Sequence, residues 1–140
     1  MPIANKCNTI TFVFQLPSQI PMKDKLAKEY FSIKHRLGCA QAVAKAFQNE
    51  LNLSDSYIAD LSKDCSGMAP GGLCGSLYAA LELCTDEKMK QTVLNEFISQ
   101  AKFPTCRDIR INRTISCRKT VEIAARLLEK HLPEDLSKSA

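Results

Sequence analysis

The 140-residue sequence predicts an all-α fold: a compact bundle of about five to six helices preceded by an irregular arm. Two features carry this prediction. From Met22 onward, apolar residues recur at intervals of three to four, which is the period of an amphipathic helix. Between these segments stand Ser, Thr and Asp, which favour helix N-termini, and Gly and Pro, which end helices. The length suits one domain that buries its own core.

The chain divides into three segments of different pattern. Residues 1–21 are predicted to be an irregular N-terminal arm, because their short apolar alternation is closed by Pro17 and Pro21. Residues 22–133 are predicted to form the helical domain. The polar composition of residues 134–140 predicts a frayed tail.

The first half of the domain is predicted to hold three helices. The first carries an apolar stripe of four residues: Leu26, Tyr30, Ile33 and Leu37. Gly38 interrupts this stripe, and a second helix is predicted over residues 39–51. Ser54 followed by Asp55 is an N-cap signal for a third helix.

The second half begins with a glycine-rich turn over residues 67–72. The helix expected after it, around residues 73–81, is apolar on most faces, so we expect it at the centre of the bundle. Three further helices are predicted to begin at capping signals: residues 85–87, Thr105 and Ser116.

Charge and composition disfavour several classes of function. The net charge is +4 and the basic residues mostly alternate with acids, as on a solvated helix face, so we expect no nucleic-acid partner. No segment approaches roughly 20 apolar residues, so no membrane span is predicted. The sequence has no Walker loop, dinucleotide-binding glycine pattern, nucleophile elbow or His-Glu-x-x-His motif, so it does not indicate an enzyme class.

Seven cysteines are the unusual feature of the composition. The count is odd and no signal peptide is evident, so a secreted disulfide scaffold is not expected. We predict a cytoplasmic protein with reduced thiols, where several cysteines indicate metal or redox chemistry. No Cys-x-x-Cys pair occurs, which argues against a thioredoxin-like site or a zinc ribbon. Covalent haem, which needs Cys-x-x-Cys-His, is excluded.

Four of the cysteines stand near predicted helix N-termini: Cys39, Cys74, Cys106 and Cys117. The unpaired N–H groups and partial positive charge of a helix N-terminus favour thiolate over thiol, and Arg107 and Arg118 would add to this effect. Thiolate is the form that binds metal and attacks disulfides. Several helix starts at one end of a bundle would also stabilise an anionic iron–sulfur cluster. The prediction requires the fold to gather these sulfurs in one electropositive pocket.

The other three cysteines are assigned no chemistry. Cys65 and Cys84 are predicted to act as small apolar residues of the core, with Cys84 at the end of an apolar helix. Cys7 lies in the predicted arm and is interpreted as incidental.

Around the four cysteines at predicted helix starts, the chain resembles a family of small redox-active proteins that is defined by its cysteine pattern. The pattern is one Cys, a Cys-Gly-Ala-x-x-Gly motif and two further Cys. The matching segments are residues 38–43, residues 67–75, and then Cys106 and Cys117 ahead of residues 121–125. The resemblance covers roughly residues 25–132. Two positions depart from the motif, because Ser76 stands in place of its Ala and Ala79 in place of its final Gly.

The resemblance implies a helical, redox-linked protein. Relatives of this domain include split-Soret cytochromes, which are dimers in which a similar helical unit accompanies haems and an iron–sulfur centre. Because this chain lacks haem attachment motifs, only the iron–sulfur centre could carry over. The resemblance names four residues as cluster ligands or redox thiols: Cys39, Cys74, Cys106 and Cys117.

Three functions remain open from the sequence. The first is an iron–sulfur or iron-binding electron-transfer protein that uses these four thiolates and needs a redox partner protein. The second is a metal-free thiol–disulfide oxidoreductase or redox sensor, with Cys106 and Cys117 as the catalytic pair. The third is a structural or zinc-binding interaction module. An apolar central helix and an arm without a partner element favour a homodimer.

Overall fold

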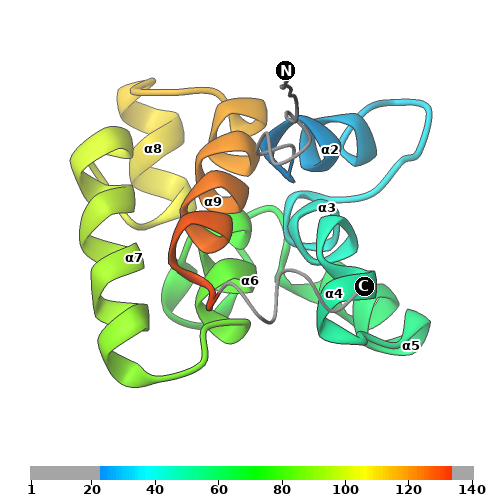
Figure 1. Ribbon diagram of the computed structural model, residues 1–140. Helices are drawn as coiled ribbons and strands as arrows, with labels where there is room; N and C mark the ends of the chain where they lie inside the picture. The colour runs from blue at the N-terminus through cyan, green and yellow to red at the C-terminus, as the bar shows by residue number, and fades with distance from the viewer. Residues whose placement is uncertain (1–22, 134–140) are drawn as a thin grey trace, which may run out of the picture.

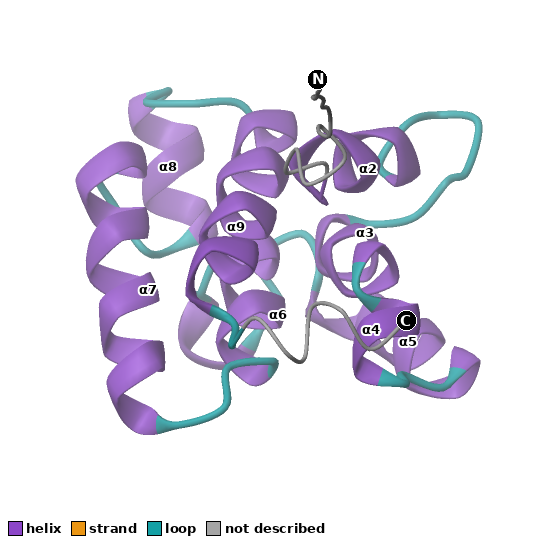
Figure 2. Ribbon diagram, viewed as in Figure 1, coloured by secondary structure: helices purple, strands orange, loops and turns teal. Residues whose placement is uncertain are grey.

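The computed structural model describes residues 23–133, and over this range the chain is all-helical with no strand (Figures 1 and 2). The predicted fold class is therefore confirmed. Both the predicted arm and the predicted tail lie outside the described residues. Within residues 23–133 no helix is both long and apolar enough to cross a membrane.

Eight α-helices form the described part of the chain, more than the five to six predicted. In chain order they are α2 (Lys23–Tyr30), α3 (Cys39–Ala46), α4 (Gln48–Leu51), α5 (Asp55–Asp60), α6 (Gly75–Glu82), α7 (Glu87–Ala101), α8 (Cys106–Asn112) and α9 (Cys117–His131). Two short 3-10 turns, Leu61–Asp64 and Pro70–Gly72, lie between α5 and α6. The second turn falls within the predicted glycine-rich turn.

Helices α6 and α9 form the centre of the bundle. α9 packs against α2, α3, α6 and α7, and α6 also contacts α3 and α7. In Figure 1, α7 and α8 lie on one side of α9, and α2 to α5 lie on the other. Leu77, Ala79 and Ala80 of α6 are completely buried, so the predicted central position of the apolar helix is confirmed.

Local capping explains where four helices begin. At each of these sites the side chain accepts a hydrogen bond from the backbone N–H three residues later, as expected for an N-cap. The four bonds are Tyr57 to Ser54 (3.0 Å), Met89 to Asp86 (2.8 Å), Asp108 to Thr105 (3.2 Å) and Lys119 to Ser116 (3.0 Å). All four lie at positions where the sequence predicts a helix start.

Two predicted helices differ from the structure. The first ends at Tyr30 instead of continuing to Leu37, and Ile33 is 89% exposed. The chain turns there, with Arg36 at φ +58°, to reach the start of α3. The predicted helix over residues 39–51 is broken at Phe47, whose φ of −109° and ψ of 10° separate α3 from α4. Phe47 is only 1% exposed, so burial of its ring accompanies the break.

Candidate functional site

A cavity of about 120 Å³ lies where several helices begin, and cysteines form much of its wall. All four predicted site residues line this cavity, together with a fifth cysteine. The five are Cys39, Cys65, Cys74, Cys106 and Cys117. The fold thus brings together sulfurs that are far apart in the sequence, and we call this cavity the cysteine pocket.

The predicted placement of the four cysteines at helix starts is confirmed. Cys39, Cys106 and Cys117 are the first residues of α3, α8 and α9, and Cys74 is the N-cap residue of α6. Their exposure differs: Cys74 is 5% exposed, whereas Cys117 lies at the surface. The pocket therefore connects a buried sulfur to an exposed one.

Backbone pairing sets the starts of α6 and α8 side by side. The Cys74 N–H donates a 2.9 Å hydrogen bond to the Pro104 carbonyl, and Leu73 pairs with Thr105 in an isolated antiparallel bridge. Because Cys74 and Cys106 directly follow the bridged residues, the pairing holds both cysteines at the same wall of the cavity.

A buried hydroxyl pair holds the start of α9 against α6. The Ser76 and Thr120 hydroxyls lie 3.1 Å apart, and Thr120 Oγ1 donates a 2.6 Å bond to the Cys117 carbonyl. Ser76, which departs from the family motif, therefore contributes a polar contact between helices. Ala79, the other departure, is fully buried in the core and does not line the pocket.

Two glycines allow the walls of the pocket to approach closely. A Cβ atom at Gly75 would lie 2.5 Å from Cys39 Sγ and 2.8 Å from the Asp64 carbonyl oxygen. A Cβ at Gly38 would overlap Cys65 Sγ and lie 3.2 Å from Cys65 Cβ. The sulfurs of Cys39 and Cys65 thus occupy space that a side chain at either glycine would fill.

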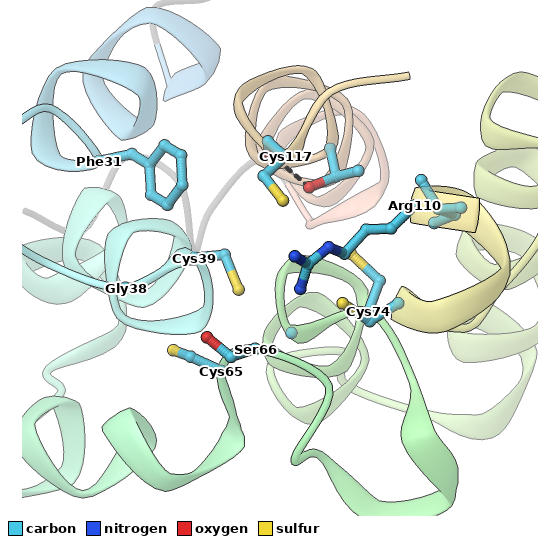
Figure 3. Close-up of a pocket in the computed structure, with 12 residues that line it drawn as sticks. Phe31, Gly38, Cys39, Cys65, Ser66, Cys74, Arg110 and Cys117 are labelled. Carbon is cyan, nitrogen blue, oxygen red and sulfur yellow. Dashed lines mark hydrogen bonds between the residues drawn. The ribbon is translucent and has the colours of Figure 1, made fainter. Parts of the chain in front are cut away.

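Arg110 is the positive charge of the pocket. Its side chain extends from α8, and its guanidinium lies in the space among Cys39, Cys74 and Cys117 (Figure 3). Burial and the charges of Cys106 and Cys74 raise the pKa of the Cys117 thiol, and Arg110 opposes this effect. The cation that lies among these sulfurs is therefore Arg110, whereas Arg107 and Arg118 were predicted from the sequence.

Cys39 and Cys65 form a hydrogen-bonded pair. The Cys39 thiol donates to the Cys65 sulfur, and this bond is the main cause that lowers the pKa of Cys65 to about 6. The backbone N–H groups of Ala40 and Gln41 in the first turn of α3 also favour the Cys65 thiolate. The same bond to Cys65, followed by burial, raises the pKa of Cys39. When Cys65 is protonated, its thiol makes only a 3.6 Å contact with the Leu61 carbonyl.

The expectation of thiolates at the four helix starts is wrong for two of them. The pKa of Cys39 and of Cys117 is raised, not lowered. The reason is geometric for α3: its free N–H groups interact with the sulfur of Cys65, which lies beyond the helix start, and not with the helix's own first residue. The N-terminus of α3 therefore stabilises the thiolate of Cys65, a neighbouring loop residue.

Cys65 was expected to be a core residue, but it lines the pocket beside Cys39. One feature of the sequence could have indicated that Cys65 lies near the pocket: it stands two residues before the glycine-rich turn that leads to Cys74. Cys84 does not line the pocket. It packs against the core, its thiol donates to the Ala80 carbonyl at 3.3 Å, and burial raises its pKa to about 11. Cys7 lies outside the described residues.

At pH 7, Cys65 is expected to be alkylated by iodoacetamide far faster than Cys84. With a pKa of about 6 roughly nine in ten Cys65 side chains are thiolate at this pH, whereas the Cys84 pKa of about 11 leaves almost none. Because the Cys65 pKa is lowered, its thiolate persists above pH 6 and is lost as the pH falls through that value. Labelling rates from peptide mass spectrometry between pH 5 and 9 measure this.

Cys84 is a suitable internal control for Cys65, because Cys65 and Cys84 are both partly buried in the same molecule. Equal labelling rates at pH 7, or a Cys65 rate that levels off only above the usual thiol pKa of about 8.5, would contradict the assignment of the thiolate.

Within residues 23–133, no three His, Cys, Asp or Glu side chains come together as a group that could hold one metal ion. The pocket sulfurs surround a shared space instead of converging on a point, and Figure 3 shows Cys39, Cys74 and Cys117 on different sides of it.

The fold and the pocket define an all-helical domain with a cysteine-lined pocket as its candidate functional site. Comparisons with protein-family models, with curated proteins and with solved structures found no match to this chain. The resemblance to the cysteine-pattern family thus remains a prediction from the sequence.

Proposed function

We propose that the chain is a redox protein that binds an iron–sulfur cluster in the cysteine pocket and transfers electrons. One observation carries this proposal: four cysteines from the starts of four helices line a single cavity. The proposed ligands are Cys39, Cys74, Cys106 and Cys117. Thiolates are the usual ligands of such clusters, and four of them complete the set.

The surroundings of the pocket support an anionic cluster. Arg110 brings a positive charge among the sulfurs, and the N-termini of α3, α6 and α9 add partial positive charge. Because Arg110 is a long, exposed side chain, it can move aside while its charge stays near the site. The alternative of a structural zinc ion needs four ligands within tetrahedral bonding distance of one centre, and no such group of His, Cys, Asp or Glu is found within residues 23–133.

A bound cluster would supply one-electron transfer, and the protein would control access to it. Cys74 is buried and Cys117 is exposed, so the site has one side sealed in the core and one side open to a partner. The exposed side is the expected route for an electron from a redox partner protein. The apolar lining of Phe31 and Ile109 would limit water in the pocket.

Anaerobic reconstitution with ferrous iron and sulfide tests the proposal. The full chain should become brown, with visible absorption that dithionite bleaches. Cys74→Ser should reduce cluster content by at least about tenfold, because even outer-shell changes at metal sites cost this much. Cys84→Ser, outside the pocket, is the matched control and should load like the wild type. A colourless wild-type protein without iron would overturn the proposal.

Metal-free thiol–disulfide exchange between Cys106 and Cys117 remains the second prediction. Both residues line the pocket, and the charge of Cys106 contributes to the raised pKa of Cys117. The hydrogen-bonded pair in the pocket is nevertheless Cys39 with Cys65, so contact between sulfurs favours a different pair. A cytoplasmic location, a homodimer and the absence of a nucleic-acid partner also stay predictions.

A further inference from the structure

We propose that Cys39 and Cys65 are a dithiol site that hydrogen peroxide oxidises to an intramolecular disulfide. The pair lies at one edge of the cysteine pocket, and Cys65 belongs to neither the proposed cluster ligands nor the family motif. Formation of the disulfide does not depend on the proposed cluster. Its effect on cluster binding rests on the proposed function, because Cys39 cannot bind iron and Cys65 at the same time.

The two cysteines are neighbours in the pocket wall: Cys65 Sγ lies against Gly38, the residue before Cys39, and Cys39 Sγ lies against Gly75, beside Cys65 Cα. The Cys39 thiol donates a hydrogen bond to the Cys65 sulfur, and the Ser66 N–H donates to the Cys39 sulfur. The position of a Cβ atom on Gly75 would be 2.5 Å from Cys39 Sγ and 3.5 Å from Cys65 Cα, so both residues border the same small space. Neighbouring cysteines that border one small space can be joined by an S–S bond of about 2.05 Å once their sulfurs approach each other.

The surroundings hold the pair together. Cys65 directly follows the 3-10 turn Leu61–Asp64, and its side chain packs under Gly38, where no Cβ intervenes. In Figure 3 the Cys65 sulfur points toward the α3 side and away from Arg110, whereas Arg110 lies among Cys39, Cys74 and Cys117. Arg110 therefore does not lie between Cys65 and Cys39 in this view.

The oxidation balances with peroxide as the named oxidant. The Cys65 sulfur, which is the hydrogen-bond acceptor of the pair, attacks one oxygen of hydrogen peroxide and breaks the O–O bond. This leaves a sulfenic acid on Cys65 and releases hydroxide, which takes up the proton that the Cys65 thiol has lost and becomes the first water. The Cys39 sulfur then attacks the Cys65 sulfur, the S–S bond forms, and the sulfenic oxygen leaves as water. In total two thiols lose two electrons and two protons, and peroxide becomes two waters.

The size of the cavity suits this oxidant. About 120 Å³ admits a peroxide molecule beside the pair. A thiol reductant would restore the pair by exchange. The disulfide would therefore act as a reversible block on the use of Cys39 as an iron ligand.

Disulfide mapping on the reduced, metal-free full chain tests the site. The protein is treated with stoichiometric hydrogen peroxide, free thiols are blocked with N-ethylmaleimide, and the chain is cut with trypsin and with cyanogen bromide. Cleavage after Met68 separates Cys65 from Cys74, which tryptic cleavage alone leaves in one peptide. The expected first cross-link joins residues 37–45 to residues 64–68, and dithiothreitol removes it.

Variants make the assignment falsifiable. Cys65→Ser cannot form this cross-link, and any disulfide of Cys39 with another cysteine should form at least about tenfold more slowly than the wild-type cross-link, whereas Cys84→Ser should behave as the wild type. In Cys39→Ser the sulfenic acid on Cys65 has no resolving thiol, so it should accumulate and react with dimedone. Circular dichroism confirms that each variant is folded. Equal cross-linking between other cysteines in the wild type, or unchanged oxidation of Cys65→Ser, would overturn the proposal.

Iron uptake after oxidation tests the consequence separately. Oxidised wild-type protein should take up no cluster until it is reduced, whereas Cys65→Ser treated with the same peroxide should still load. If the disulfide forms but the reduced protein never binds iron, the dithiol site stands and the cluster proposal fails. If the reduced protein binds a cluster but peroxide does not form this disulfide, the cluster proposal stands and the dithiol site fails.

Discussion

Replacing Gly75 with alanine is expected to lower the free energy of unfolding by about 1–3 kcal/mol and to abolish cluster binding in the cysteine pocket. The added Cβ would lie 2.5 Å from Cys39 Sγ and 2.8 Å from the Asp64 carbonyl oxygen. The sulfur can rotate away, but the carbonyl belongs to the backbone, so the start of α6 must shift away from the loop that carries Cys65. Chemical denaturation and anaerobic iron reconstitution measure the two effects.

Gly71→Ala separates steric overlap from the cost of the backbone conformation. Gly71 has a φ of +70°, and an added Cβ would meet nothing within 4 Å. Its replacement should cost about 1–2 kcal/mol through the left-handed conformation alone, while iron uptake remains. If Gly75→Ala binds iron like the wild type at unchanged stability, the close approach of α6 to Cys39 is not needed for the site.

Phe97→Ala is expected to have the largest effect on stability, a loss of about 3–5 kcal/mol. Phe97 is among the largest side chains that are completely buried, and it lies on α7, which packs against α6 and α9. Removing its ring leaves a cavity beside the two central helices whose N-termini carry Cys74 and Cys117. Urea denaturation followed by circular dichroism measures the change.

Ile111→Ala is the matched control for this substitution, because it also removes a large apolar side chain but at a position that is 64% exposed. Its effect should stay within about 0.5 kcal/mol. Similar losses for the two variants would mean that Phe97 is not part of a closely packed core.

The helix starts follow from local sequence. At Ser54, Thr105 and Ser116 the capping hydrogen bond closes over three residues, so the signal and the structure lie in the same short segment. The placement of four cysteines at helix starts is local in the same way, because each directly follows a capping or glycine position or, for Cys74, is the N-cap itself.

The ends of helices were harder to predict. The apolar spacing extended the first helix to Leu37, but the chain leaves the helix after Tyr30 and exposes Ile33. The spacing of apolar residues reports which face of a helix can be buried, and it does not report whether another element is present to bury it. Only the packing of the complete chain decides this.

By itself, the sequence determined the all-helical class, the caps and the set of four cysteines at helix starts. Only the tertiary structure decided that Cys65 joins them, that Arg110 is the cation of the pocket, and that the thiolate belongs to Cys65 instead of Cys39. The physical reason is that a thiol's acidity depends on the donors and charges that surround it in space. At this site those groups come from α3, α6, α8, α9 and the loop before α6, which are adjacent only in the folded chain.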